Sequence, residues 1–199
     1  MIKRFLFLFL LITVIPIYCY AVTTNKDYVY NIEKDMYYTL DGNVYSGTIQ
    51  HENLQGIFIT KISQGRALYI THHLPDGSTH IYVNTYPKQN TRIVKVYDQY
   101  NKLISEYTTI NNILEGKYIS YNESGLINSI YNFKQGKREG IAELSNKAGT
   151  KWGEILFKHN EPISGFCYEP ITRKKIKLSN ITIQNILNEN GSEGIICSE

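Results

Sequence analysis

Residues Glu115–Gly140 read EGKYISYNESGLINSIYNFKQGKREG, and this pattern recurs along the chain with a period of about 24. Arg92–Glu115 aligns with Gly116–Gly140, which aligns in turn with Gly140–Gly165. The recurring positions are Glu115 and Glu139, Gly116 and Gly140, Tyr97 and Tyr121, Gly125 and Gly149, Tyr107 and Tyr131, and Phe133 and Phe157. Self-similarity at a fixed period of this length indicates stacked copies of one supersecondary unit. Such arrays present a surface to other molecules, so the repeat predicts architecture better than chemistry.

Short strands and tight turns are predicted from Met36 to about Phe166. Tyr, Ile and Val alternate there with polar residues, which is the period of a half-buried strand. Glycine and asparagine recur at short intervals because hairpin turns need positive φ. The predicted turns are Asp41-Gly42, Gln64-Gly65, Asp76-Gly77, Tyr100-Asn101, Ser124-Gly125, Gln135-Gly136 and Ala148-Gly149.

The best-defined hairpin is centred on Pro75-Asp76-Gly77-Ser78. A two- or four-residue loop predicts that Leu74 pairs with Thr79, His73 with His80, and Ile70 with Val83. In this register one face carries Leu68, Ile70, Ile81 and Val83, and the other carries Tyr69, Thr71, His73, His80 and Tyr82.

The C-terminal segment 167–199 departs from the repeat and reads as a cap. Ser179 is a plausible N-cap, an apolar stripe follows it, and Gly191 suits a helix stop, so a short helix is predicted over about 180–190. It would cover the open end of the sheet. Cys167 and Cys197 are predicted to form a disulfide, closing a loop of about 30 residues; a redox or metal-binding thiol pair is the alternative.

Residues 1–21 read as an export signal. Lys3 and Arg4 precede an apolar run from Phe5 to Ile17, and cleavage is expected after Ala21. An uncleaved membrane anchor is the alternative. Cleavage would remove Lys3 and Arg4 and no acidic residue, so the formal net charge of +3 falls to +1 in the mature chain. A nearly neutral chain provides no strong field for nucleic acid, which is therefore not expected as a partner.

The pattern EGKYISYNESGLINSIYNF at Glu115–Phe133 resembles a MORN repeat, and most closely the bacterial MORN-like variant of the YwqK-family "antitoxin" type. The motif positions are Gly116, Tyr118, Tyr121, Gly125, Tyr131 and Gly136, and an opening motif LDGNVYSGT spans Leu40–Thr48. The resemblance covers about residues 37–165. It implies a mainly β fold, a single-layer antiparallel sheet of hairpins that repeat at this period, here closed by the short C-terminal helix. It also implies an interaction module; nothing in these residues supports neutralisation of a toxin.

Tyrosine supplies the first candidate site. The chain has 17 Tyr, and a row of them on one sheet face would form a binding platform for glycan or peptide. The alternative is that Tyr is the cross-strand ladder residue of the repeat. The residues proposed for binding are Tyr69, Tyr82, Tyr97, Tyr107, Tyr118, Tyr121 and Tyr131.

Histidine and lysine supply two further candidates. His72, His73 and His80 lie near Asp76, but a full set of metal ligands is not evident, so neither a metal nor another cofactor is predicted. The basic runs Lys134–Arg138 and Arg173–Lys177 would attract anionic lipid or polysaccharide, unless they are solvated turns. No catalytic motif is present, so no enzymatic activity is expected.

The sequence thus predicts a signal peptide at 1–21, a leader at 22–36, a repeat domain at 37–166 and a cap at 167–199. The expected protein is exported, periplasmic or secreted, and non-enzymatic. It would bind a protein partner in the cell envelope or a host. The alternative is a surface module that binds lipid head groups or glycan through the Tyr-rich face and basic turns.

Overall fold

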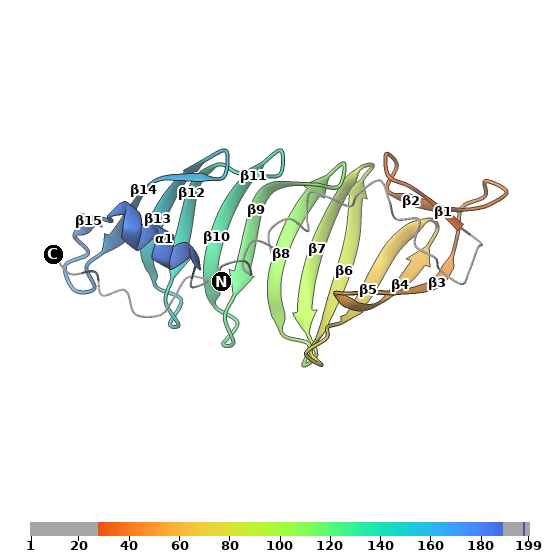
Figure 1. The fold of residues 1–199 in the computed structure, drawn as a ribbon, viewed down its shortest axis with the longest axis horizontal. Helices are drawn as coiled ribbons and strands as arrows, with labels where there is room; N and C mark the ends of the chain where they lie inside the picture. Colours follow the sequence, from red (N-terminus) through yellow and green to blue (C-terminus); the bar gives the residue numbers. More distant parts are fainter. Residues whose placement is uncertain (1–27, 189–196, 198–199) are drawn as a thin grey trace, which may run out of the picture. The chain divides into compact units, whose positions relative to one another are not determined.

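The computed structural model describes residues 28–188 and Cys197. The predicted signal peptide and the predicted helix stop at Gly191 lie outside these residues. The described part is mainly antiparallel strand with one helix, which confirms the predicted fold class (Figure 1). The strands are β1 (Tyr28–Asn31), β2 (Met36–Thr39), β3 (Gly47–Asn53), β4 (Gly56–Ser63), β5 (Arg66–His73), β6 (Thr79–Lys88), β7 (Thr91–Asp98), β8 (Leu103–Ile110), β9 (Ile113–Tyr121), β10 (Ile127–Lys134), β11 (Lys137–Arg138), β12 (Gly140–Ser145), β13 (Lys151–Lys158), β14 (Glu161–Tyr168) and β15 (Lys175–Lys177).

The chain divides into two compact units. Unit 1 contains the described residues up to Asn101 together with Thr108–Leu114, and unit 2 contains Lys102–Tyr107 and the described residues from Glu115 onward. In unit 1, β3 to β7 pair in chain order. In unit 2, β9, β10, β12, β13, β14 and β15 pair in chain order, and β11 pairs with β10.

The sequence period appears as a repeated turn. Gly77, Asn101, Gly125 and Gly149 have positive φ, and each N–H donates to the carbonyl three residues earlier, at 2.8–3.1 Å. The turn that contains Gly77 shows that the structural repeat begins one unit before Arg92, where the sequence repeat was predicted to start. All seven predicted turns contain a residue with positive φ. Two further turns, at Asn111-Asn112 and His159-Asn160, were not predicted. They lie one period before and one period after Gln135-Gly136 and also have two consecutive positive φ values.

The core of unit 2 lies on one face of its sheet. Side chains that alternate inward from β12, β13 and β14 meet the helix α1 (Asn180–Asn188), whose Ile183 and Ile186 are buried against them. The buried cluster consists of Ala142, Leu144, Ile155, Phe157, Cys167, Leu178, Ile183, Ile186 and Cys197. The Ser179 hydroxyl accepts the Thr182 N–H at 3.1 Å, so the predicted N-cap is confirmed. A helix 180–188 agrees with the predicted 180–190 as far as the described residues extend.

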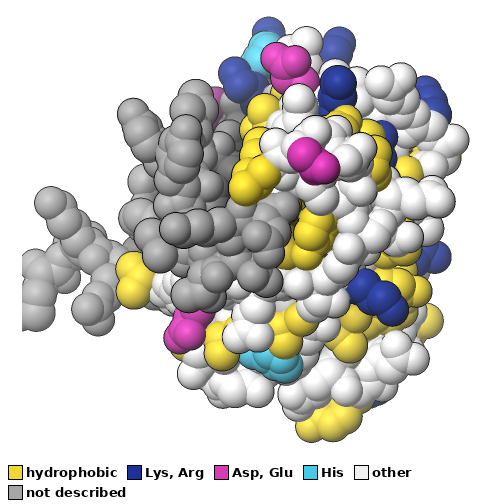
Figure 2. All heavy atoms as spheres, turned by 90° about the vertical axis from the view of Figure 1, so that its right-hand side faces the viewer, with side chains coloured by type: hydrophobic (Ala, Val, Ile, Leu, Met, Phe, Trp, Pro, Cys, Tyr) yellow, Lys and Arg dark blue, Asp and Glu magenta, His cyan; other side chains and the backbone are white. Residues whose placement is uncertain are grey.

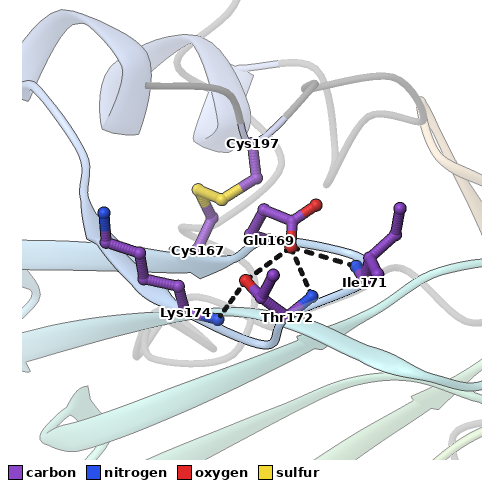
Figure 3. Close-up of a disulfide and its surroundings, with 6 residues drawn as sticks. All are labelled: Cys167, Glu169, Ile171, Thr172, Lys174 and Cys197. Atoms are coloured by element: carbon purple, nitrogen blue, oxygen red, sulfur yellow. Dashed lines mark hydrogen bonds between the residues drawn. A yellow bond between two sulfur atoms is a disulfide. The ribbon is translucent and has the colours of Figure 1, made fainter.

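The predicted disulfide is present in the cap of unit 2. Cys167 and Cys197 are bonded across a sequence separation of 30, and both are buried in the cluster beneath α1 (Figure 3). In the neighbouring turn, the Glu169 carboxylate accepts hydrogen bonds from Ile171 N, Thr172 N and the Thr172 hydroxyl. Cys167 belongs to β14, so the cap residues begin within the last long strand of the sheet.

The predicted register of the His-rich hairpin is wrong by one residue. His72, not His73, lies opposite His80, and Tyr69 lies opposite Val83. The reason is the turn, in which Leu74 N donates to Ser78 O and Gly77 adopts φ 85°. This leaves five residues between the paired His73 and Thr79, instead of an even number, and so shifts every partner by one.

The segment expected to be a leader at 22–36 includes a strand. β1 pairs with β2 in a separate two-stranded sheet of unit 1, and the Tyr37 N–H donates to Gly65 O in the turn between β4 and β5. Figure 2 views the side of the molecule on which β1–β3 lie in Figure 1. Hydrophobic side chains, in yellow, are exposed there among polar ones. Val29, Leu40, Val44 and Leu54 are among the exposed hydrophobic residues there.

Candidate functional site

Three of the seven candidate tyrosines form an aromatic ladder in unit 2. Tyr118 lies directly opposite Tyr131, and the rings of Tyr107 and Tyr118 stack with centroids 5.6 Å apart. Tyr131 packs against the buried cluster and reaches the Phe157 ring at 6.0 Å. Burial raises the pKa of the Tyr131 hydroxyl. These rings therefore line the core side of the sheet, as cross-strand ladder residues do.

The other four candidate tyrosines do not join this ladder. Tyr121 points to the opposite face, where its hydroxyl donates to the Glu106 carboxylate at 3.0 Å. In unit 1, Tyr82 lies on the face opposite to that of Tyr69 and Tyr97, because Ile81 pairs with Tyr97 and Val83 with Tyr69. The predicted sharing of one face by Tyr69 and Tyr82 is therefore wrong, and the seven residues form no single platform.

Three of the four described histidines of unit 1 form a row across neighbouring strands, and the fourth, His73, lies opposite Thr79 on the other face of β5. The pairings place His51, Phe58, His72, His80 and Asp98 side by side on β3 to β7. The Phe58 ring stacks on His51 at 4.8 Å and on His72 at 3.9 Å. His72 is buried, and its Nε2 lies 2.7 Å from Gln55 O. Within residues 28–188 and Cys197, no group of three or more His, Cys, Asp or Glu side chains could hold a metal ion.

A tyrosine cluster at the start of unit 1 was not found from the sequence. The Tyr30 hydroxyl donates to buried Asp35 at 2.6 Å, and Arg92 lies 3.7 Å from the same carboxylate. Burial, followed by the charge of Asp35, raises the pKa of Tyr30. The Tyr30 ring packs against Tyr37 at 4.8 Å. This cluster connects the β1–β2 hairpin to β7 within unit 1, so we interpret it as structural.

The face of the unit 2 sheet opposite α1 is exposed, because among the described residues no helix or strand covers it. Ile141 lies opposite Leu156 on this face, and these side chains are 48% and 39% exposed. We call this surface the open face. It consists of Ile141, Glu143, Lys151, Glu154, Leu156, Phe166, Tyr168, Arg173, Lys175 and Lys177.

Cations and aromatic rings lie together at one end of the open face. The Lys175 ammonium is 4.3 Å from the Phe166 ring centroid, and the Arg173 guanidinium is 5.1 Å from the Tyr168 centroid. Lys151 lies 5.9 Å from the same Tyr168 ring. We call Lys151, Phe166, Tyr168, Arg173 and Lys175 the cation–aromatic cluster. Contacts at these distances hold a cation by attraction to the ring face.

Glu154 links the two lysines of this cluster. Its carboxylate lies 2.7 Å from the Lys151 ammonium and 2.8 Å from that of Lys175. Hydrogen bonds from Lys151 and then Lys175 lower the pKa of Glu154 to about 2. Glu154 therefore stays ionised in ordinary buffers and orders the lysines. From the sequence, Arg173 and Lys175 were noted as part of a basic run. Lys151, Glu154, Phe166 and Tyr168 were missed because only the strand register brings them to that run.

In the second basic run, Lys134–Arg138, Arg138 packs against the core while Lys134 and Lys137 are exposed. The Arg138 guanidinium lies 5.1 Å from the ring centroids of both Tyr131 and Phe157, on the core side of the sheet. Burial lowers the pKa of Arg138.

Among residues 28–188, no helix has both the length and the apolar character needed to cross a membrane.

Comparisons with known proteins do not place the chain in a family. No family model and no curated protein matches it. The crystal structure of TarM aligns at 13% identity over 65% of this chain and 21% of that chain, with a TM-score of 0.25. A structure of an S. aureus TarM mutant in complex with Fondaparinux, alpha-GlcNAc-glycerol and UDP aligns at 11% identity, over 65% and 21% of the two chains, with a TM-score of 0.24. The chain spans about a fifth of the length of these solved chains, and scores this low carry no argument.

Proposed function

We propose that this chain is an exported, non-enzymatic, MORN-like repeat protein that binds a protein partner through the open face of unit 2. The observation that carries this proposal is the pair of exposed aliphatic side chains, Ile141 and Leu156, next to the cation–aromatic cluster. Protein interfaces characteristically combine an apolar centre with aromatic and arginine side chains at its edge. The partner would be a protein of the cell envelope or of a host.

The hollows of unit 2 favour a surface site over a small-molecule site. They measure about 240 Å³, lined by residues that include Lys102 and Tyr121, and about 360 Å³, lined by residues that include Glu169 and Lys174. Small-molecule pockets span roughly 300–1,000 Å³, so both lie at or below the low end of that range. A flat surface of exposed strands suits a macromolecule better.

The test is capture of the partner by the mature protein with two matched variants. Leu156→Asp places a charge at the centre of the open face, and Ile181→Asp makes the same chemical change on α1, where Ile181 is 76% exposed. The protein is cross-linked in its native envelope fraction, purified, and its partners are identified by mass spectrometry. One protein should be recovered with the unchanged chain and with Ile181→Asp, and lost with Leu156→Asp. Equal recovery with both variants would reject the open face as the binding surface.

Binding of lipid head groups or glycan is the second candidate, and the exposed cations at 173–177 favour it. Recovery of only lipid or glycan in the same experiment, lost in high salt, would replace the first proposal with this one.

A further inference from the structure

The charge balance of the open face is positive at the end next to its aliphatic pair. Lys151, Arg173, Lys175 and Lys177 lie there with two carboxylates, Glu143 and Glu154. Both carboxylates contact Lys151, at 3.4 Å for Glu143 and 2.7 Å for Glu154. Within residues 28–188, no ion pair joins Arg173 or Lys177 to a carboxylate, so these two cations supply the excess positive charge of this end.

The cations are also ordered. Arg173 donates from Nη2 to Lys151 O at 2.7 Å, and its guanidinium lies over the Tyr168 ring. A guanidinium held in this way keeps further N–H donors for a carboxylate, with little rotamer entropy left to lose. Lys177 lies on β15 opposite Phe166, at an exposed position. Both cations adjoin the strand that carries the aromatic rings.

We infer that the open face selects an acidic protein segment, whose carboxylates contact Arg173 and Lys177 while its apolar side chains cover Ile141 and Leu156. This inference rests on the proposed function and specifies the chemistry of the partner. Because cations lie beside aliphatic residues on this face, a matching segment must carry both acidic and apolar side chains, as a sequence of alternating Glu and Leu does. An anionic membrane or a sulfated polysaccharide would use the cations alone and leave the aliphatic pair unused.

The experiment compares two labelled decapeptides, one alternating Glu and Leu and one alternating Gln and Leu, by fluorescence anisotropy with the full mature protein. The Glu peptide should bind about tenfold or more tightly than the Gln peptide at about 50 mM salt, and the difference should shrink at about 500 mM. Vesicles containing anionic phospholipid and a sulfated polysaccharide serve as competing probes.

Two double variants that remove the same charge test whether the Glu peptide binds at Arg173 and Lys177. Arg173→Gln/Lys177→Gln leaves both lysines on Glu154 and should abolish the preference for the Glu peptide. Lys117→Gln/Lys134→Gln removes the same charge from exposed positions of β9 and β10, strands that contribute no residue to the open face, and should preserve it. Trp152 packs against the buried cluster, so its fluorescence verifies that unit 2 is folded in each variant.

The inference is overturned if both peptides bind equally, if the two variants weaken binding equally, or if vesicles or polysaccharide bind and the Glu peptide does not. If partner capture remains sensitive to Leu156→Asp while the Glu peptide fails to bind, the acidic selectivity is wrong and the protein-binding proposal stands. If capture is also insensitive to Leu156→Asp, both fail.

Discussion

Glu115 and Glu139 occupy equivalent positions in successive repeats, and their carboxylates have equivalent partners. Glu115 Oε2 accepts the Gln135 N–H at 2.8 Å, and Glu139 Oε2 accepts the His159 N–H at 2.9 Å. Each carboxylate therefore ties its strand to the turn of the next hairpin. This is a structural role for acids whose regular spacing is a consequence of the repeat.

Removal of one such carboxylate should have a small, measurable effect. Glu139→Ala is expected to lower the free energy of unfolding by about 1 kcal/mol, because the His159 N–H loses its acceptor. Glu139→Gln keeps an acceptor oxygen and should lose less. Urea unfolding followed by Trp152 fluorescence measures both variants, and an equal loss for Ala and Gln would contradict the hydrogen-bond explanation.

The histidine row of unit 1 should make stability depend on pH. Burial, and then the proximity of His72, lowers the pKa of both His51 and His80, while Asp76 and Asp98 act in the opposite direction on His80. An unfolded histidine has a pKa of about 6.5, so the unfolded state binds protons more readily than the native state. Stability is therefore complete above about pH 6.5 and is lost as the pH falls through this value toward the lowered native pKa values.

The measurement is urea unfolding of the mature protein, followed by far-UV circular dichroism, at about pH 5 and about pH 7.5. The midpoint should be higher at the upper pH. His80→Gln removes one titrating group and should reduce the difference between the two midpoints. A difference that is absent, reversed or unchanged in this variant would remove the row as its cause.

At the scale of the element, α1 packs against a glycine of β14, at a position where a larger side chain does not fit. A Cβ added at Gly165 would lie 2.9 Å from Ile183 Cγ1 and 3.2 Å from Leu178 Cδ1. Gly165→Val is therefore expected to lower the free energy of unfolding by about 1–3 kcal/mol, because α1 must move away from β14. Ser164→Val on the same strand faces the opposite side and is the control. Chemical unfolding compares the two, and equal effects would exclude the contact with α1 as the cause.

The turns and the helix were predictable because their signals are local. Gly125 and Gly149 need positive φ, and Ser179 caps the helix with its own hydroxyl, so the nearest residues suffice to locate them. The turn at His159-Asn160 was missed because neither residue is glycine, although Asn tolerates the left-handed region well.

The strand register, and with it the sheet face on which each side chain lies, could not be predicted from such local signals. Both depend on one extra residue in a loop. The predicted pairing of the His-rich hairpin gathers aliphatic side chains on one face, whereas the actual pairing mixes apolar and polar side chains on both faces, so this separation did not determine the register. The five-residue connection after His73 decides it, and it moves Tyr69 and Tyr82 to opposite faces. The open face was missed for a related reason, since Lys151, Tyr168 and Lys175 meet only through the pairing of β13, β14 and β15.

At the scale of the whole molecule, the export hypothesis makes a prediction about covalent structure. A disulfide persists in an oxidising compartment and is uncommon in the cytosol. The chain has three cysteines, of which Cys167 and Cys197 are bonded, while Cys19 belongs to the predicted signal peptide. The export hypothesis therefore predicts a mature protein with no free thiol and an N-terminus at Val22.

The bond between Cys167 and Cys197 allows export and stability to be measured separately. Intact-mass and thiol analysis of protein recovered from its native compartment should give residues 22–199 with both cysteines bonded. Cys197→Ser should lower the free energy of unfolding by roughly 3–4 kcal/mol, because a loop of about 30 residues is no longer closed in the unfolded chain. Wild-type protein unfolded in reductant should show a similar loss, and the variant should be insensitive to reductant. A native protein that carries free Cys167 would contradict export, even if the variant were destabilised, because the thiol analysis does not depend on the unfolding experiment. A native protein that retains Met1 with both cysteines bonded would instead favour the uncleaved anchor.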